Sequence, residues 1–151
     1  EPEALTVHFR TKKEMSKVEA HYDLIPDVAK LRDEVSPKTK LIVNGDIKSA
    51  SEAQKFVELG ADGIMIGRGV FANPFCFEKE PKEHTRAELI DLMNYHLDLY
   101  EKYELTPYDP LKRFFKIYIN NFPGASDIRE KLMNTKTIAE ARDILKEISK
   151  E

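Results

Sequence analysis

Two short apolar runs each lead into a polar turn that contains glycine: Leu41-Ile42-Val43-Asn44-Gly45-Asp46-Ile47 and Gly63-Ile64-Met65-Ile66-Gly67-Arg68-Gly69. A helix-patterned segment lies between them, which is typical of parallel strands joined by a helical crossover. Parallel βα units place such turns on one edge of the sheet, where backbone N–H groups can converge on a phosphate. In (β/α)8 barrels, the loops after the last two strands frequently build a phosphate site. The two runs therefore predict a parallel α/β sheet with an anion site at one edge.

The composition limits where the protein works and what it binds. Its 151 residues carry a net charge of −3, so RNA or an anionic membrane would need a local basic patch. A single cysteine, Cys76, excludes an internal disulfide and favours the reducing cytoplasm. No apolar stretch approaches the ~18 residues of a membrane-spanning helix. The chain starts with Glu1-Pro2-Glu3, without a signal peptide or an initiator Met, so we expect it to be cut from something longer.

The first half of the chain alternates predicted strands and helices. The strands are expected at 4–9, 40–44 and 62–66, and the helices at 24–35 and 51–59, the latter opened by a capping box at Ser51. Three parallel strands cannot close a barrel, and parallel sheets are normally covered on both faces. We therefore expect residues 1–80 to be the last three βα units of a (β/α)8 TIM barrel, with the rest of the barrel missing from this chain.

The second half shows only helical patterns. Helices are expected at 85–103, 111–122, 128–133 and 138–148, with a capping box opening at Thr85 and a cap at Thr137. A polar stretch that contains Pro81 separates the two halves. The sequence therefore predicts a small all-α domain over residues 81–151.

The glycine turns carry the candidate binding residues of the first half. Gly45, Gly67 and Gly69 would let the backbone approach phosphate oxygens closely, and Arg68 could give the phosphate a bidentate contact. Asp46 would repel that anion, so we expect it to serve a ribityl hydroxyl or to orient the loop. Each turn alone could equally be a plain loop. The two turns on consecutive parallel strands favour a bound phosphate.

Other candidates lie on the first strand and in the helical half. His8 and Arg10 share one strand face, either as a merely polar strand end or as contacts to a cofactor, phosphate or substrate carbonyl. In the predicted helix 111–122, aromatic residues form one face, and Lys112, Arg113 and Lys116 lie opposite. That basic face is either simply solvated or a grip for RNA phosphates. Cys76 is surrounded by apolar residues, so we expect it to be a buried packing residue. The histidines show no metal-ligand spacing.

These residues resemble a known family, the tRNA-dihydrouridine synthases. The barrel part of the resemblance rests on Thr6-Val7-His8-Phe9-Arg10-Thr11, Asn44-Gly45-Asp46-Ile47, Asp62-Gly63-Ile64-Met65-Ile66-Gly67-Arg68-Gly69 and Asn73-Pro74. The tail is similar to the family's helical tRNA-binding domain through Pro110-Leu111-Lys112-Arg113, Phe122-Pro123-Gly124-Ala125 and Ile128-Arg129. The resemblance spans nearly the whole chain and is most specific in the barrel motifs.

The resemblance implies a function and a set of site residues. The family reduces tRNA uridines to 5,6-dihydrouridine with FMN, which NADPH reduces. It implies FMN contacts from His8, Asn44, Gly45, Asp46, Gly67 and Arg68, and tRNA contacts from Arg10, Lys112, Arg113 and Lys116. The family's cysteine acid and a flavin-contacting lysine lie in motifs that this chain lacks, so no catalytic residue and no metal ligand is assigned. Cys76 is not taken for the missing acid.

Two alternatives remain open from the sequence. One is another FMN-dependent TIM-barrel oxidoreductase that acts on a small molecule, and the other is a non-catalytic RNA-binding module. We expect the chain alone to be inactive, because it lacks the proton donor. The expected partners are tRNA and either the missing N-terminal half or a second copy of the chain, which would pair through open strand edges. No membrane partner is expected.

Overall fold

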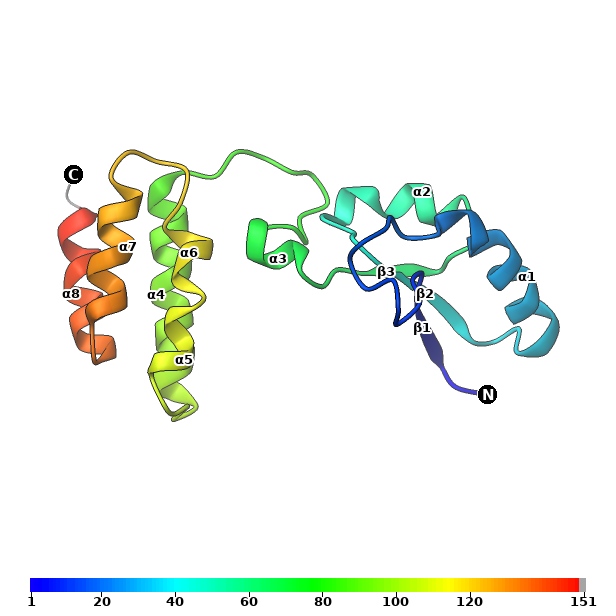
Figure 1. The fold of residues 1–151 in the computed structure, drawn as a ribbon, viewed down its shortest axis with the longest axis horizontal. Coiled ribbons are helices and arrows are strands. Elements are labelled where there is room, and N and C mark those ends of the chain that lie inside the picture. The colour runs from blue at the N-terminus through cyan, green and yellow to red at the C-terminus, as the bar shows by residue number, and fades with distance from the viewer. Residues whose placement is uncertain (150–151) are drawn as a thin grey trace. The chain divides into compact units, whose positions relative to one another are not determined.

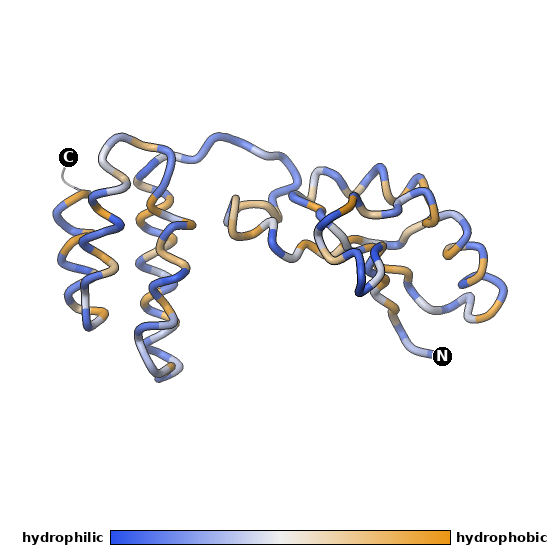
Figure 2. The backbone as a smooth tube through the Cα atoms, viewed as in Figure 1, coloured by the Kyte–Doolittle hydropathy of each residue, from blue (hydrophilic) through white to orange (hydrophobic). Residues whose placement is uncertain are grey.

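The computed structural model describes residues 1–149 of the chain. These residues form two compact units, divided between Pro81 and Lys82. Each unit has a hydrophobic core of its own. The part of the connection between α3 and α4 that leads up to α4 is hydrophilic in the hydropathy colouring (Figure 2). Within residues 1–149, the two core clusters share no residue.

The first unit is a parallel three-stranded sheet with its helices (Figure 1). Its elements are β1 (Ala4–His8), α1 (Ile25–Val35), β2 (Lys40–Asn44), α2 (Ala53–Val57), β3 (Gly63–Met65) and α3 (Gly69–Ala72), with 3-10 turns at Tyr22–Leu24 and Ala50–Glu52. The strand order is β1-β2-β3, and both pairings are parallel. The predicted fold class is confirmed: the chain is α/β with three parallel strands, consistent with the C-terminal part of a (β/α)8 barrel.

One face of the sheet packs against the helices. Val7 and Val43 pair in register, as do Val43 and Ile64, and these three residues cluster with Ile25 of α1 and Phe56 of α2. Successive strand residues point to opposite faces, so the alternate positions face away from this core. The sheet thereby holds the carboxyl ends of all three strands along one edge.

The start of α2 differs from the prediction. The expected capping box at Ser51 is wrong, because Glu52 accepts hydrogen bonds from the backbone nitrogens of Lys48 at 2.8 Å and Ser49 at 3.2 Å. Ser49 is therefore the cap of the turn that precedes α2. Ser-x-Ser offers two candidate caps, and only the folded loop shows which one Glu52 reaches.

The second unit is entirely helical. Its elements are α4 (Arg86–Lys102), α5 (Asp109–Lys112), α6 (Phe115–Tyr118), α7 (Ala125–Asn134) and α8 (Ile138–Ile148). The predicted caps at Thr85 and Thr137 are confirmed, since each side chain accepts a bond from the backbone three residues on. At the Thr85 cap, the hydrogen bond from the Thr85 amide lowers the pKa of Glu88 to about 2.

The predicted continuous helix 111–122 is wrong. The segment is broken into α5 and α6, and the bonds from Phe114 to Leu111 and from Ile117 to Phe114 join residues three apart. Tight turns repeat about every three residues rather than 3.6, so the buried face shifts. Lys112 thereby shares the inward side with Phe115 and is only 6% exposed, which overturns the expectation of a solvated Lys112.

Within residues 1–149, no helix is both long and apolar enough to span a membrane.

Candidate functional site

The carboxyl edge of the sheet brings three loops together. His8 ends β1 and pairs in register with Asn44, which ends β2 and pairs in turn with Met65 of β3. The Asn44 side chain donates from Nδ2 to the backbone oxygen of Met65 at 2.8 Å and so ties the ends of β2 and β3. Residues that are far apart in the sequence therefore meet at this edge, as parallel strands require.

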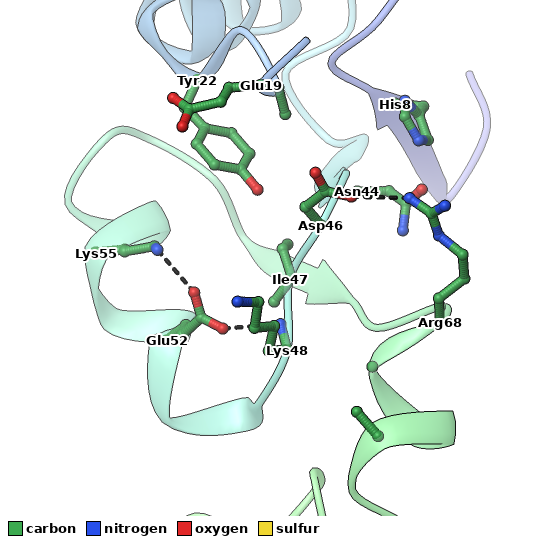
Figure 3. Close-up of a pocket in the computed structure, with 14 residues that line it drawn as sticks. His8, Glu19, Tyr22, Asn44, Asp46, Ile47, Lys48, Glu52, Lys55 and Arg68 are labelled. Carbon is green, nitrogen blue, oxygen red and sulfur yellow. Dashed lines mark hydrogen bonds and ion pairs between the residues drawn. The ribbon is translucent and has the colours of Figure 1, made fainter. Parts of the chain in front are cut away.

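A cavity of about 730 Å³ opens at the edge (Figure 3). Its lining includes five of the predicted cofactor contacts: His8, Asn44, Asp46, Gly67 and Arg68. The remaining one, Gly45, is not part of the lining, although its carbonyl accepts a hydrogen bond from the Tyr22 hydroxyl. The volume lies in the ordinary range of about 300–1,000 Å³ for small-molecule sites.

Several lining residues were not anticipated from the sequence. Figure 3 shows Glu19, Tyr22, Lys48, Glu52 and Lys55 on the side of the cavity away from Arg68. Lys55 donates to Glu52 at 2.8 Å and lies 4.7 Å from the centre of the Phe56 ring. Glu19 lies in the irregular segment after β1 and Tyr22 begins the 3-10 turn that follows it, and neither segment is long enough for a periodic pattern to indicate a direction. The capping position of Glu52 was the one sequence signal that could have placed this side of the cavity.

Arg68 is an exposed cation at the glycine turns. Its side chain is 66% exposed, and its guanidinium donates to Asp46 at 2.9 Å and to the Ser16 hydroxyl at 2.8 Å. The Asp46 carboxylate therefore bonds to side chains, and its expected role toward a ribityl hydroxyl or in orienting the loop stays a prediction. Exposure leaves the guanidinium accessible to a ligand.

Arg10 does not lie on the cavity, although the sequence analysis considered it as a contact to a cofactor, phosphate or substrate. Its side chain is 2% exposed and pairs with Asp46, while its Nε donates to the backbone oxygen of Val18 at 2.7 Å. The hydrogen bond from Arg10 is the main reason that the pKa of the Asp46 carboxyl is lowered. Arg10 is thus buried behind the site and is not part of its lining.

The three glycines of the turns have different roles. Gly45 has a φ of +132°, which favours glycine, and a Cβ there would lie 3.1 Å from that of Ala20. A Cβ on Gly69 would come within 2.9–3.0 Å of the Ile47–Lys48 backbone oxygens, so Gly69 lets the two loops touch. Gly67 has no neighbouring atom within 4 Å of such a Cβ. Of the three, Gly67 is the glycine that leaves room for a ligand.

The helical unit has a smaller basic hollow of about 330 Å³. It is lined by Lys112, Arg113, Phe115, Lys116, Arg129, Glu130 and Met133. The Lys112 ammonium is 2.7 Å from an Asp109 carboxylate oxygen and donates to the Met133 carbonyl at 3.1 Å, which makes it a structural cation. Arg113 and Lys116 are exposed, and Arg129, which the sequence reasoning did not assign, lies on the same hollow.

Neither Cys76 nor a metal cluster offers further chemistry in the described residues. Cys76 is 1% exposed, and burial raises the pKa of its thiol. No group of at least three His, Cys, Asp or Glu residues between 1 and 149 could hold a metal ion.

The fold and site define a class: a parallel α/β unit with a cavity at its strand ends, lined by two glycine turns and Arg68, followed by a helical unit with a basic hollow. Residues 2–151 match the family model described as dihydrouridine synthase (Dus). Because this match covers nearly the whole sequence, the chain belongs to the dihydrouridine synthase family.

Curated relatives agree with the family assignment. The chain is 57% identical over 145 residues to "Probable tRNA-dihydrouridine synthase 2" of Bacillus subtilis (strain 168), which covers 93% of this chain and 45% of that protein. It is 53% identical over 147 residues to "Probable tRNA-dihydrouridine synthase" of Staphylococcus aureus (strain Mu50 / ATCC 700699), covering 95% of this chain and 45% of the relative. The chain therefore spans a little under half the length of these relatives.

Proposed function

We propose that this chain provides the phosphate-binding edge of an FMN site in a tRNA-dihydrouridine synthase. The observation that carries the proposal is the exposed Arg68 guanidinium beside Gly67, whose Cα faces open space on the cavity. Such a pair suits a phosphate, which takes bidentate bonds from Arg and allows close approach of the main chain. Membership of the dihydrouridine synthase family supports FMN as the ligand that brings the phosphate.

The proposed cofactor contacts divide by position. Arg68 and Gly67 would hold the phosphate, Asn44 and Gly45 would shape the end of β2 beside it, and His8 would face the flavin. Bound FMN would supply hydride transfer to a tRNA uridine, with NADPH as the reductant. In this proposal, the role of these residues is to bind FMN and to orient it. The buried Cys76, whose pKa is raised, is a poor candidate for a proton donor.

The helical unit is the proposed tRNA contact. Arg113 and Lys116 are exposed cations on one hollow, and Arg129 lies on the same hollow. Lys112 is left out of the proposed contact surface, because its ammonium already bonds to Asp109 and Met133. RNA phosphates would be bound mainly by charge, so binding should weaken steeply as salt rises.

FMN binding to the purified chain tests the cofactor proposal. Quenching of FMN fluorescence should titrate with the wild-type chain and be lost in Arg68→Ala. Arg113→Ala is the matched control, since it removes an exposed arginine from the other unit and should leave FMN binding intact. Equal FMN binding by the wild-type chain and Arg68→Ala would refute the phosphate assignment.

Filter binding of tRNA with a salt titration tests the second half of the proposal. Arg113→Ala with Lys116→Ala should weaken binding and flatten the salt dependence by about one phosphate contact for each residue. Arg68→Ala serves here as the control. FMN binding without tRNA binding would favour an FMN-dependent oxidoreductase acting on a small molecule. tRNA binding without any FMN affinity would favour a non-catalytic RNA-binding module.

The chain by itself should not turn over tRNA. Incubation with FMN, NADPH and tRNA should yield no dihydrouridine, because no proton donor has been assigned among its residues, and product formation would contradict this. β1 and β3 each have one unpaired edge in the sheet as described, so sedimentation should detect self-association or pairing with a complementary half. A cytoplasmic location remains a prediction from the single cysteine.

A further inference from the structure

The carboxylate of Asp46 lies between two guanidinium groups. Arg68 donates from Nη2 to Oδ1 at 2.9 Å, and Arg10 donates from Nη2 to Oδ2. Asp46 also has a φ of +50°, a left-handed conformation that is uncommon for residues other than glycine. Two charge-assisted bonds therefore hold this residue and determine how its carboxylate meets Arg68.

The charges of these three side chains do not cancel. A pair formed by Asp46 and Arg68 alone would be neutral, and a phosphate would gain little from it. Arg10 takes the other carboxylate oxygen, so the cluster keeps one net positive charge. Because Arg68 is the exposed member, this charge is presented where the cavity opens.

Arg10 is poorly placed to bind a ligand itself. Its side chain is 2% exposed, it is not part of the cavity lining, and its Nε is bonded to Val18. Its Nη1 is buried without a hydrogen-bond partner in residues 1–149, which costs stability. Asp46 is the one acidic group that it pairs with in that part of the chain. Any effect of Arg10 on a ligand must therefore be transmitted mainly by Asp46.

We propose that Arg10 is a positioning residue of the FMN phosphate site and acts through Asp46. Its charge converts Asp46 from a counter-ion that would cancel Arg68 into a support that orients Arg68 and leaves positive charge for the phosphate. This inference rests on the proposed function, since it requires FMN to bind at Arg68. It replaces the expectation that Arg10 touches phosphate, substrate or tRNA directly.

A double-mutant cycle tests the proposal. The dissociation constants of FMN and of riboflavin, which lacks the phosphate, are measured for the wild-type chain, Arg10→Gln, Asp46→Asn and the double variant. Arg10→Gln should weaken FMN roughly tenfold, the size expected for coupled residues of one charged network. Riboflavin affinity should not change. In the Asp46→Asn background, Arg10→Gln should cause no further loss of FMN affinity.

Two variants control for charge and for damage to the fold. Arg10→Lys keeps the charge and should restore part of the FMN affinity. Arg32→Gln is the matched control, because Arg32 is also largely buried and pairs with Asp62, the residue before β3, away from the site. It should leave FMN affinity unchanged. Circular dichroism of each variant checks that the unit remains folded.

Each outcome separates the explanations. Equal losses from Arg10→Gln in both backgrounds would mean that Arg10 acts directly on FMN, which would overturn the proposal. Unchanged FMN affinity in Arg10→Gln, or equal losses for FMN and riboflavin, would overturn it as well. All of these results leave the FMN site itself standing. A wild-type chain that binds no FMN would overturn the proposed function, and the inference with it.

Discussion

Replacing Gly69 by Ala should destabilise the sheet unit by forcing two loops apart. An added Cβ would lie 2.9 Å from the Lys48 oxygen and 3.0 Å from the Ile47 oxygen, where ordinary contact begins near 3.4 Å. Both oxygens are backbone atoms, so they cannot turn aside as a flexible side chain would, and the third neighbour, Ile66 Cγ2, is also only 2.9 Å away. The loop that carries Asp46 would have to move by the difference between these distances and 3.4 Å, which is a few tenths of an ångström. Gly67 is the matched position, since a Cβ there meets nothing within 4 Å.

The size of the effect follows from two opposing terms. Overpacking a close contact costs about 1–3 kcal/mol, and alanine gains up to about 1 kcal/mol over glycine in a helix. Gly69 is the first residue of α3, where little of that gain is realised. The net expectation for Gly69→Ala is a loss of about 1–2 kcal/mol in the free energy of unfolding. Gly67→Ala should stay within about 0.5 kcal/mol of the wild type.

Urea unfolding followed by circular dichroism measures both variants. Gly69→Ala should lower the midpoint of the transition that belongs to the sheet unit, and Gly67→Ala should leave it unchanged. FMN affinity should show the reverse order. Gly67→Ala should weaken FMN binding, because it adds a methyl group where the phosphate is proposed to approach. Equal stability of the two variants, or a larger loss in Gly67→Ala, would refute the reasoning from loop contact.

Three further predictions concern the helical unit. Thr85→Ala should cost it about 1 kcal/mol in urea unfolding because the N-cap is lost, whereas Thr85→Ser should be nearly neutral, and equal effects would contradict the cap. His96, bonded to Tyr118 at 2.9 Å, has a pKa lowered by burial. The unfolded chain therefore binds the proton more readily, so stability should be full above pH ~6.5 and decline as the pH falls below it. His96→Gln should remove that decline, and an unchanged profile would exclude His96 as its source. Lys112→Met should lower stability by about 1 kcal/mol, because the Met133 carbonyl loses its hydrogen bond, but should keep tRNA affinity, and a loss of affinity as large as that of Lys116→Ala would return Lys112 to the RNA surface.

The sequence predicted the order of elements well wherever the signal was local. The parallel strands, the crossover helix α1 and the caps at Thr85 and Thr137 follow from periodicity and from residues three positions apart. Errors occurred where neighbouring residues allowed more than one arrangement. Ser49 and Ser51 both suited a cap, and the segment from Leu111 to Phe122 had an acceptable 3.6-residue pattern although it folds as tighter turns.

The candidate site was partly predictable. The expectation that His8, Asn44, Asp46, Gly67 and Arg68 meet at one edge came from the rule that parallel strands share their carboxyl ends, and all five line one cavity. The opposite side of that cavity was not foreseen, because it is built from an irregular loop and from the start of a short helix. No repeating pattern tells which side chains of such segments turn inward.

The sequence by itself determined the parallel α/β rhythm, the helical second half and the presence of Arg68 between two glycines, because these depend on spacing within a few residues. Only the tertiary structure decided the partners of those residues. The bond from Arg10 to Asp46 joins positions 36 apart, and that from Arg68 to Asp46 joins positions 22 apart. The contact of Gly69 with the Ile47–Lys48 backbone and the burial of Lys112 likewise arise from packing between distant segments. Contacts between positions so far apart in the sequence depend on how the whole chain packs, which local preferences do not specify.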